Sequence, residues 1–308
     1  MDVMKQLYPE AEVPRGAGPL PKVLRIVRGP SALRRWALAS LVMNIAIVVT
    51  GGLVRLTGSG LGCPTWPRCT EDSYVSHPQL GIHGTIEFGN RLFTFALVIT
   101  AMLTFVSAML YREDGHPRTD LRWLTGGLAL GIPLQGVIGG ITVLTQLNPY
   151  VVGLHLLLSM VLIALAVLLV RKTWHFTPAG ASGLSVFATR VTFVLMWLAA
   201  WLGTLVTGSG PHAGAENSTR NGLDGLLLTR LHTSMVYATV AASVVCFILL
   251  RSRAVLLLLL VEMVQVGIGV AQYRTGLPIW LVALHLLGAS LAIATVSNLT
   301  LSVTRRRS

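Results

Sequence analysis

The chain has 308 residues, of which 53% are hydrophobic and only 12% are charged. A soluble domain carries about twice that charged fraction, so the composition excludes an ordinary water-soluble protein. The formal net charge of +12 needs no nucleic acid to explain it, because the topology predicted below accounts for the excess of cations.

Eight runs with little or no charge follow an N-terminal segment, and most have the roughly 20 residues that a helix needs to cross a bilayer. The runs cover 36–54, 92–111, 123–147, 150–170, 191–208, 231–250, 254–272 and 279–303. The fifth is short, and the seventh contains Glu262, which is costly in hydrocarbon. The sequence predicts an all-α membrane protein with eight transmembrane helices.

Lysine and arginine are unevenly distributed among the segments between these runs. Of the 24 cations, 18 lie in the N-terminal segment, in the loops that follow even-numbered runs and at the C-terminus. The positive-inside rule then predicts that both termini are cytoplasmic. Residues 1–31 are interpreted as a basic cytoplasmic tail, because they lack the apolar core of a signal peptide, and 305–308 as a second basic tail.

Three cysteines occur, and two of them, Cys63 and Cys69, lie in the first external loop. A disulfide is permitted there in bacteria, with free thiols or metal ligands as the alternatives. Because one cysteine pair without a second pair nearby is a poor zinc signal, the disulfide is favoured. Cys246 lies among apolar residues and is expected to pack in the core.

Parts of the chain repeat at fixed offsets. Thr-Gly-Ser-Gly at 57–60 recurs at 207–210, and Leu-His-Leu-Leu at 154–157 recurs at 284–287. The repeat predicts two four-helix bundles, 32–172 and 187–304, joined by a cytoplasmic linker at 173–186. Since each half has an even number of spans, the two halves are expected to be parallel repeats with the same orientation.

Four polar residues recur near the outer start of the even-numbered runs: Asn90, His155, His232 and His285. At 1.5 Å per residue, all four fall within roughly 10 Å of one membrane surface. Histidine is costly in hydrocarbon without a partner, and two ligands at one depth on facing helices can occupy the axial positions of a haem. We therefore predict haem ligation, with hydrogen-bonded helix contacts as the alternative.

Glu87 lies three residues before Asn90 and shares its helix face. If Asn90 is equated with His232, Glu87 corresponds to Thr229, so that only the first half carries this carboxylate. Glu87 is a candidate for proton transfer at the cofactor site, and the alternative is an ion pair with an arginine such as Arg91.

Two arginines near the outer surface, Arg91 and Arg230, are candidates to bind haem propionates as guanidinium forks, or else to extend to the headgroup region. His83, seven residues before Asn90, either replaces a missing ligand or lies in a loop.

The segment 61–69 is expected to be a stiff cap over the site or simply a stable loop. The remaining histidines are expected to be solvated or to shape a loop: His116, His175 and His212.

These residues resemble one family closely, the haem A synthases of the CtaA type. The resemblance covers nearly the whole chain and rests on the run from Gly51 to Pro67, on 87–91 and on the histidines at 155, 232 and 285. It implies an oxidoreductase of a bacterial cell membrane that oxidises a methyl group of haem O to a formyl group, giving haem A for cytochrome oxidase, and that carries haem b.

The resemblance also implies roles for individual residues. His232 and His285 would hold haem b in the second half, where it would relay electrons, and the first half would receive haem O with Glu87 near the reacting methyl. Cys63 and Cys69 would match the external cysteine pair of the family.

One residue departs from the family pattern, which commonly has histidine where this chain has Asn90. Because asparagine is a poor iron ligand, the iron of haem O would be bound by His155 alone, by His83, or with water. Our hypothesis is that this iron is five-coordinate, with one face open to oxygen.

Two other functions stay open. One is a b-type cytochrome that transfers electrons in the membrane, which would need two bis-histidine sites, and Asn90 spoils one of them. The other is a non-catalytic haem-binding relative, such as a chaperone or transporter subunit. Glu87 favours the oxidising enzyme over the cytochrome, and the family motifs favour it over the non-catalytic relative. The expected partners are haem O, haem O synthase, cytochrome oxidase assembly factors and membrane lipid, with a homo-oligomer left open.

Overall fold

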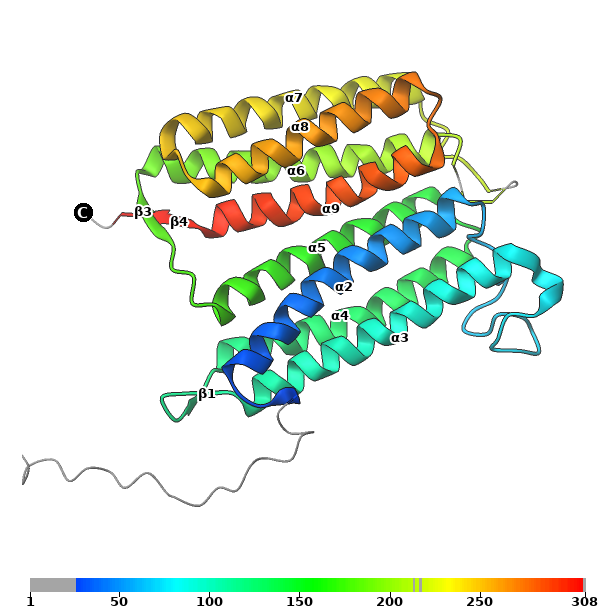
Figure 1. The fold of residues 1–308 in the computed structure, drawn as a ribbon. Coiled ribbons are helices and arrows are strands. Elements are labelled where there is room, and N and C mark those ends of the chain that lie inside the picture. Colours follow the sequence, from blue (N-terminus) through cyan, green and yellow to red (C-terminus); the bar gives the residue numbers. More distant parts are fainter. Residues whose placement is uncertain (1–25, 213, 216–217, 307–308) are drawn as a thin grey trace, which may run out of the picture.

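The computed structural model describes residues 26–212, 214–215 and 218–306. Eight helices in this part of the chain are long and apolar enough to cross a membrane, which confirms the prediction of an all-α membrane protein with eight spans (Figure 1). They are α2 (Pro30–Leu56), α3 (Gly81–Leu110), α4 (Thr119–Leu144), α5 (Pro149–Thr173), α6 (Gly183–Ser209), α7 (Gly225–Leu250), α8 (Arg253–Arg274) and α9 (Ile279–Leu301).

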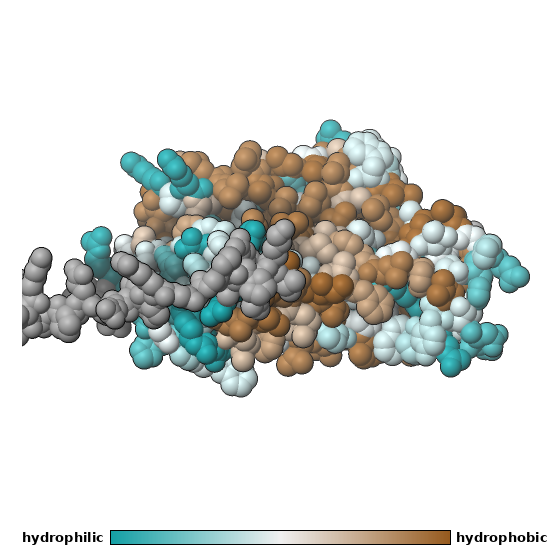
Figure 2. Space-filling view, turned by 60° about the horizontal axis from the view of Figure 1, so that its bottom comes forward, coloured by the Kyte–Doolittle hydropathy of each residue, from teal (hydrophilic) through white to brown (hydrophobic). Residues whose placement is uncertain are grey.

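Successive helices run in opposite directions, so their connections gather at two ends of the array (Figure 1). The end that we call the disulfide end holds the described residues of 57–80, 145–148, 210–224 and 275–278. The opposite end holds 111–118, 174–182, 251–252 and 302–306, and the described chain begins and finishes there. Hydrophobic side chains form a broad band across the middle, and hydrophilic side chains gather toward both ends (Figure 2). The surface is that of a multi-pass membrane protein.

Most of the helices begin before the apolar runs, because polar turns at their ends can lie in the headgroup region. Four of them begin with a capping side chain that accepts a hydrogen bond from a backbone N–H of the first turn: Asn148, Ser182, Asp224 and Ser252. The largest difference is at α3, which begins at Gly81 rather than near 92. Asn90 therefore lies nine residues after the start of its helix, whereas His155, His232 and His285 lie six or seven residues after theirs.

The helices pack as two sets. Within α2–α5, α3 contacts α2 and α4, and α5 contacts α2 and α4; within α6–α9, α6 contacts α7 and α9, and α8 contacts α7 and α9. The sets meet through α2, α5, α6 and α9 (Figure 1), where Val48, Met160, Ile163 and Ile293 form a buried cluster.

Two arginines join these sets by hydrogen bonds at opposite ends of the array. At the disulfide end, Arg55 of α2 donates to the carbonyl oxygens of Thr207 (3.1 Å) and His212 (2.8 Å). At the opposite end, Arg171 of α5 donates to the side-chain oxygen of Asn298 in α9 at 2.8 Å. His212 thus shapes a loop, as expected.

Short strands complete the opposite end of the array. β1 (Arg112–Glu113) and β2 (His116–Pro117) form an antiparallel hairpin, whereas β3 (Ala179–Ala181) pairs in parallel with β4 (Val303–Arg305). The sequence did not predict the second pair, because its strands are far apart in the chain and have no common pattern. His116 and His175 are exposed here, as expected. A 3-10 turn, η1 (Pro78–Leu80), leads into α3.

Candidate functional site

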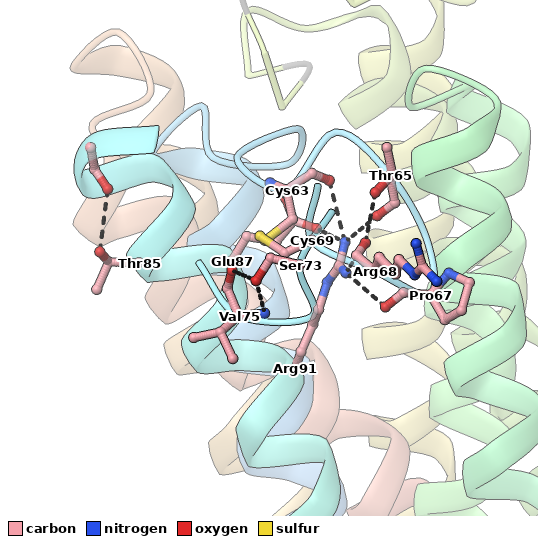
Figure 3. Close-up of a disulfide and its surroundings, with 11 residues drawn as sticks. Cys63, Thr65, Pro67, Arg68, Cys69, Ser73, Val75, Thr85, Glu87 and Arg91 are labelled. Atoms are coloured by element: carbon pink, nitrogen blue, oxygen red, sulfur yellow. Dashed lines mark hydrogen bonds and ion pairs between the residues drawn. A yellow bond between two sulfur atoms is a disulfide. The ribbon is translucent and has the colours of Figure 1, made fainter. Parts of the chain in front are cut away.

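A disulfide-closed loop covers the start of α3 (Figure 3). Cys63 and Cys69 form the predicted disulfide, and both are fully buried. The indole of Trp66 lies so close to Gly140 of α4 that a Cβ at that glycine would overlap it. The loop is therefore packed on two helices, which agrees with a stiff cap.

Arg91 of α3 holds this loop from below (Figure 3). Its guanidinium donates to the side chain of Glu87 at 2.6 Å and to four backbone carbonyl oxygens of the loop, which belong to Cys63, Thr65, Pro67 and Arg68. The other carboxylate oxygen of Glu87 accepts the backbone N–H of Cys63 at 2.6 Å. Glu87 is only 5% exposed, so the carboxylate is a buried link between α3 and the loop.

Asn90 and His83 occupy different surroundings on α3. The side-chain oxygen of Asn90 accepts a hydrogen bond from the hydroxyl of Thr50 in α2 at 2.8 Å, and Asn90 is half-buried. His83 is exposed in the first turn of α3, and its Nδ1 lies 2.9 Å from Ser59 Oγ. Seven helical residues separate His83 from Asn90, a rise of about 10 Å, so His83 is not at the depth of Asn90.

The two histidines of the second helix set face each other. The ring centroids of His232 in α7 and His285 in α9 are 6.5 Å apart, and the ring planes are inclined by 74°. His232 Nδ1 lies 2.9 Å from the carbonyl oxygen of Ala199 in α6. A ring N–H donated to a backbone carbonyl fixes the tautomer and leaves Nε2 available as a ligand.

Each predicted ligand lies opposite a glycine of the preceding helix. A Cβ at these glycines would lie 3.3–3.4 Å from the Cε1 atom of the histidine ring, for the pairs Gly139–His155, Gly203–His232 and Gly269–His285. At the fourth position, a Cβ at Gly51 would lie 4.0 Å from the amide nitrogen of Asn90. The glycines therefore leave little more than van der Waals distance between the neighbouring backbone and the three histidine rings.

Matching glutamines support two of these histidines. Gln135 donates to the backbone carbonyl of His155 at 3.3 Å, and Gln265 donates to that of His285 at 2.6 Å. The helix pair α4–α5 therefore has the same contacts as α8–α9. No hydrogen bond reaches Nδ1 of His155 or His285 from any residue that the structure describes.

The paired histidines suit a metal whose other coordination positions are already filled, as in a porphyrin. Within the described part of the chain, no group of three or more His, Cys, Asp or Glu residues could hold a metal ion. The pair His232–His285 fits an iron between the rings, because two metal–nitrogen bonds of about 2 Å plus the inner half of each ring give about 6 Å between centroids. A porphyrin iron with two axial positions meets this requirement.

Sequence reasoning missed the residues that position the predicted ones, namely Thr50, the carbonyl of Ala199 and the facing glycines. The aligned glycines at 139 and 269 were a signal for the last of these. Arg230 is exposed, and its side chain forms no ion pair with any residue that the structure describes.

Eight apolar helices with half-buried histidines between them define a class of protein, the multi-pass membrane proteins with a histidine site inside the helix array. More particularly, the chain belongs to the COX15-CtaA family, described as cytochrome oxidase assembly protein, whose family model matches residues 34–83 and 81–297.

Similar proteins from bacteria carry the name Heme A synthase. The protein from Geobacillus thermodenitrificans is 30% identical over 149 residues, which cover 47% of this chain and 45% of the relative. That from Methylorubrum extorquens is 32% identical over 65% of this chain and 60% of its own length. The match to the Sphingopyxis alaskensis protein is 25% identical and covers 88% of this chain and 92% of the relative. The chain thus spans about half to three-fifths of the first two relatives.

Proposed function

We propose that this protein is a haem A synthase, an oxidoreductase of haem A biosynthesis that converts a methyl group of haem O to a formyl group. Membership of the COX15-CtaA family and the names of the relatives support this function. The structural observation that carries it is the facing pair His232–His285, because its 6.5 Å separation suits two axial ligands of one haem.

The second helix set is the proposed haem b site. His232 and His285 would hold the iron, and the carbonyl of Ala199 and the amide of Gln265 orient these two ligands from neighbouring helices. When bound, haem b would supply one-electron redox chemistry. Arg230 stands two residues before His232, and its exposed guanidinium, which forms no ion pair within the described part of the chain, would be available to a propionate.

The first helix set is the proposed pocket for haem O. His155 corresponds to His285 and would bind the substrate iron, while Asn90, held by Thr50, takes the position that His232 has in the other set. An amide is a poor iron ligand but a good hydrogen-bond donor, so the Asn90 side would stay open to a small molecule.

We propose that Glu87, one helical turn from Asn90, accepts protons from the reacting substrate. Arg91 positions Glu87 and the loop, and we assign it no propionate.

We further propose that the two sets are parallel repeats, about 32–172 and 187–304, with the linker at 173–186 and both termini in the cytoplasm. The matching glycine and glutamine contacts support the repeat, as does the contact of α2 with α9, which corresponds to that of α6 with α5. Most lysines and arginines belong to the end opposite the disulfide, which supports the orientation. The haem sites would then face the outer leaflet.

The test is to co-express the chain with a haem O synthase in a bacterial host that lacks haem A, and to identify the extracted haems. Haem A is expected with the intact chain and not with a chain carrying both His232→Ala and His285→Ala. Haem O and haem b without haem A would refute the catalytic function, and a purified protein without Soret absorbance would refute haem binding.

A further inference from the structure

A carboxyl group lies in the middle of the second helix set, and the proposed function gives it no role. Glu262 is nine residues after the start of α8 and twelve before its end, and it is 5% exposed. One carboxyl oxygen accepts the hydroxyl of Ser243 in α7 at 2.8 Å. The other is buried, and none of the residues that the structure describes offers it a hydrogen bond.

The first helix set fills the corresponding place with apolar side chains. The offset of 130 aligns Glu262 with Ile132, and the pairing of His232 with Asn90 aligns Ser243 with Ala101. Ile132 and Ala101 belong to one buried apolar cluster. A well-packed apolar pair usually serves stability at least as well as buried polar groups, so packing alone does not require the carboxyl group.

Polar side chains lie along α8 between Glu262 and the disulfide end, where the histidine pair lies. Glu262, Gln265, Gly269 and Gln272 share one face of α8, at spacings of three, four and three residues, and reach toward the disulfide end. Gln265 donates to the carbonyl of His285. The side-chain oxygens of Gln265 and Gln272 are buried without a partner in the described part of the chain. Buried polar atoms of this kind are commonly satisfied by water, which can also carry protons.

We propose that Glu262 is a proton-loading group, which takes up one proton when the iron held between His232 and His285 takes up one electron, and releases it on reoxidation. This inference rests on the haem b site of the proposed function. The electron comes from a one-electron reductant, such as a reduced redox mediator or an electrode, and turns ferric into ferrous iron. The proton comes from water at the disulfide end and turns the carboxylate into a carboxylic acid; no other bond changes.

The physical reason is the loss of one positive charge at the iron. Glu262 lies seven helical residues, or roughly 10 Å, below Gly269, which touches His285. Over that distance in a weakly screening interior, the ferric site favours the carboxylate. Reduction removes this attraction, and burial then favours the neutral acid.

Few other groups near Glu262 can titrate. From α7 the buried thiol of Cys246 faces this region, where it lies 3.4 Å from the hydroxyl of Thr192 in α6. The titratable side chain of α9 is His285, and the charges of α8 besides Glu262 are Arg253 and Arg274 at its ends.

The experiment is a redox titration of the purified, haem-loaded full chain at a series of pH values, followed by visible absorbance. In the wild type, the midpoint potential is expected to fall as the pH rises, by up to about 59 mV per pH unit, which corresponds to one proton per electron. Glu262→Gln should flatten this slope. The matched control is Glu71→Gln, which neutralises an exposed carboxylate two residues after the disulfide-closed loop and should keep the wild-type slope. An equal slope in Glu262→Gln and wild type would overturn the inference.

A second measurement is made on the wild type alone, so it does not depend on whether the Glu262→Gln variant folds. The reduced-minus-oxidised infrared difference spectrum of the wild type should gain the C=O stretch of a protonated carboxyl group on reduction. If that band does not form, Glu262 takes up no proton and the inference fails. Failure of the proposed function looks different, because a protein without bound haem b has no midpoint potential to titrate.

Discussion

Removing the guanidinium of Arg91 should loosen the disulfide-closed loop. The variant Arg91→Met removes this group and keeps a side chain of similar length. The variant leaves the carboxylate of Glu87, which is 5% exposed, without its charged partner. It also removes the Arg91 donor from four loop carbonyls, of which, among the residues that the structure describes, only that of Arg68 keeps another donor, the hydroxyl of Thr65. Breaking a buried ion pair in this way costs about 3–5 kcal/mol. We expect the lower end, about 3 kcal/mol, because the Arg91 side chain is 19% exposed.

The assay is amide hydrogen exchange of the loop. Because the N–H of Cys63 donates to Glu87, its exchange reports on the opening of this contact. With 1.4 kcal/mol for each factor of ten, a loss of about 3 kcal/mol predicts exchange about a hundredfold faster in Arg91→Met. Arg230→Met is the matched control, since Arg230 is exposed at the same end of the array.

A double variant separates charge from packing. Adding Glu87→Gln to Arg91→Met removes the uncompensated charge but keeps an acceptor for Cys63, so exchange should slow again by about tenfold. If Arg91→Met exchanges like the wild type, Arg91 does not hold the loop. If the double variant exchanges as fast as Arg91→Met, the unpaired carboxylate is not the cause.

Three further predictions concern the proposed haem sites. His285→Ala should lose the low-spin haem absorbance of the purified protein, because one axial ligand is removed; an unchanged spectrum would contradict the assignment. Asn90→His should raise the low-spin fraction when haem O is bound, since it adds a second imidazole, and the five-coordinate hypothesis is wrong if the fraction stays constant. Glu87→Ala should lower haem A formation in the co-expression assay by about 10²–10⁴-fold while haem b stays bound, and normal haem A yield would remove Glu87 from the mechanism.

The transmembrane helices could be predicted from the sequence because the bilayer imposes one simple rule on every span. The rule depends on the length of an apolar run, so it does not predict the end of a helix that continues outside the apolar region. That is why α3 was expected near 92 but begins at Gly81. The first turns of α3 depend on the disulfide loop, whose position no local pattern predicts.

The candidate site was predictable only in part for the same reason. The depth of a residue below the membrane surface can be counted along its own helix. His232 and His285 have similar depths, so the sequence predicted that they lie near each other, as they do. The angle between their rings, the hydroxyl of Thr50 on Asn90 and the reach of Arg91 into the loop arise from contacts between distant segments. In the sequence, Glu262 is only a charged residue in an otherwise apolar run. Its hydrogen-bond partner Ser243 could not be predicted, because it belongs to another helix.

The arginines that join the two helix sets have a mechanical consequence. Arg55 ties α2 to the end of α6, and Arg171 ties α5 to α9 at the other extreme of the same interface. A transporter that alternates its access must open such an interface first on one side and then on the other, and would have to break one of these ties in every half-cycle. An array fastened at both extremes is suited instead to keeping the two proposed haem sites at a constant separation.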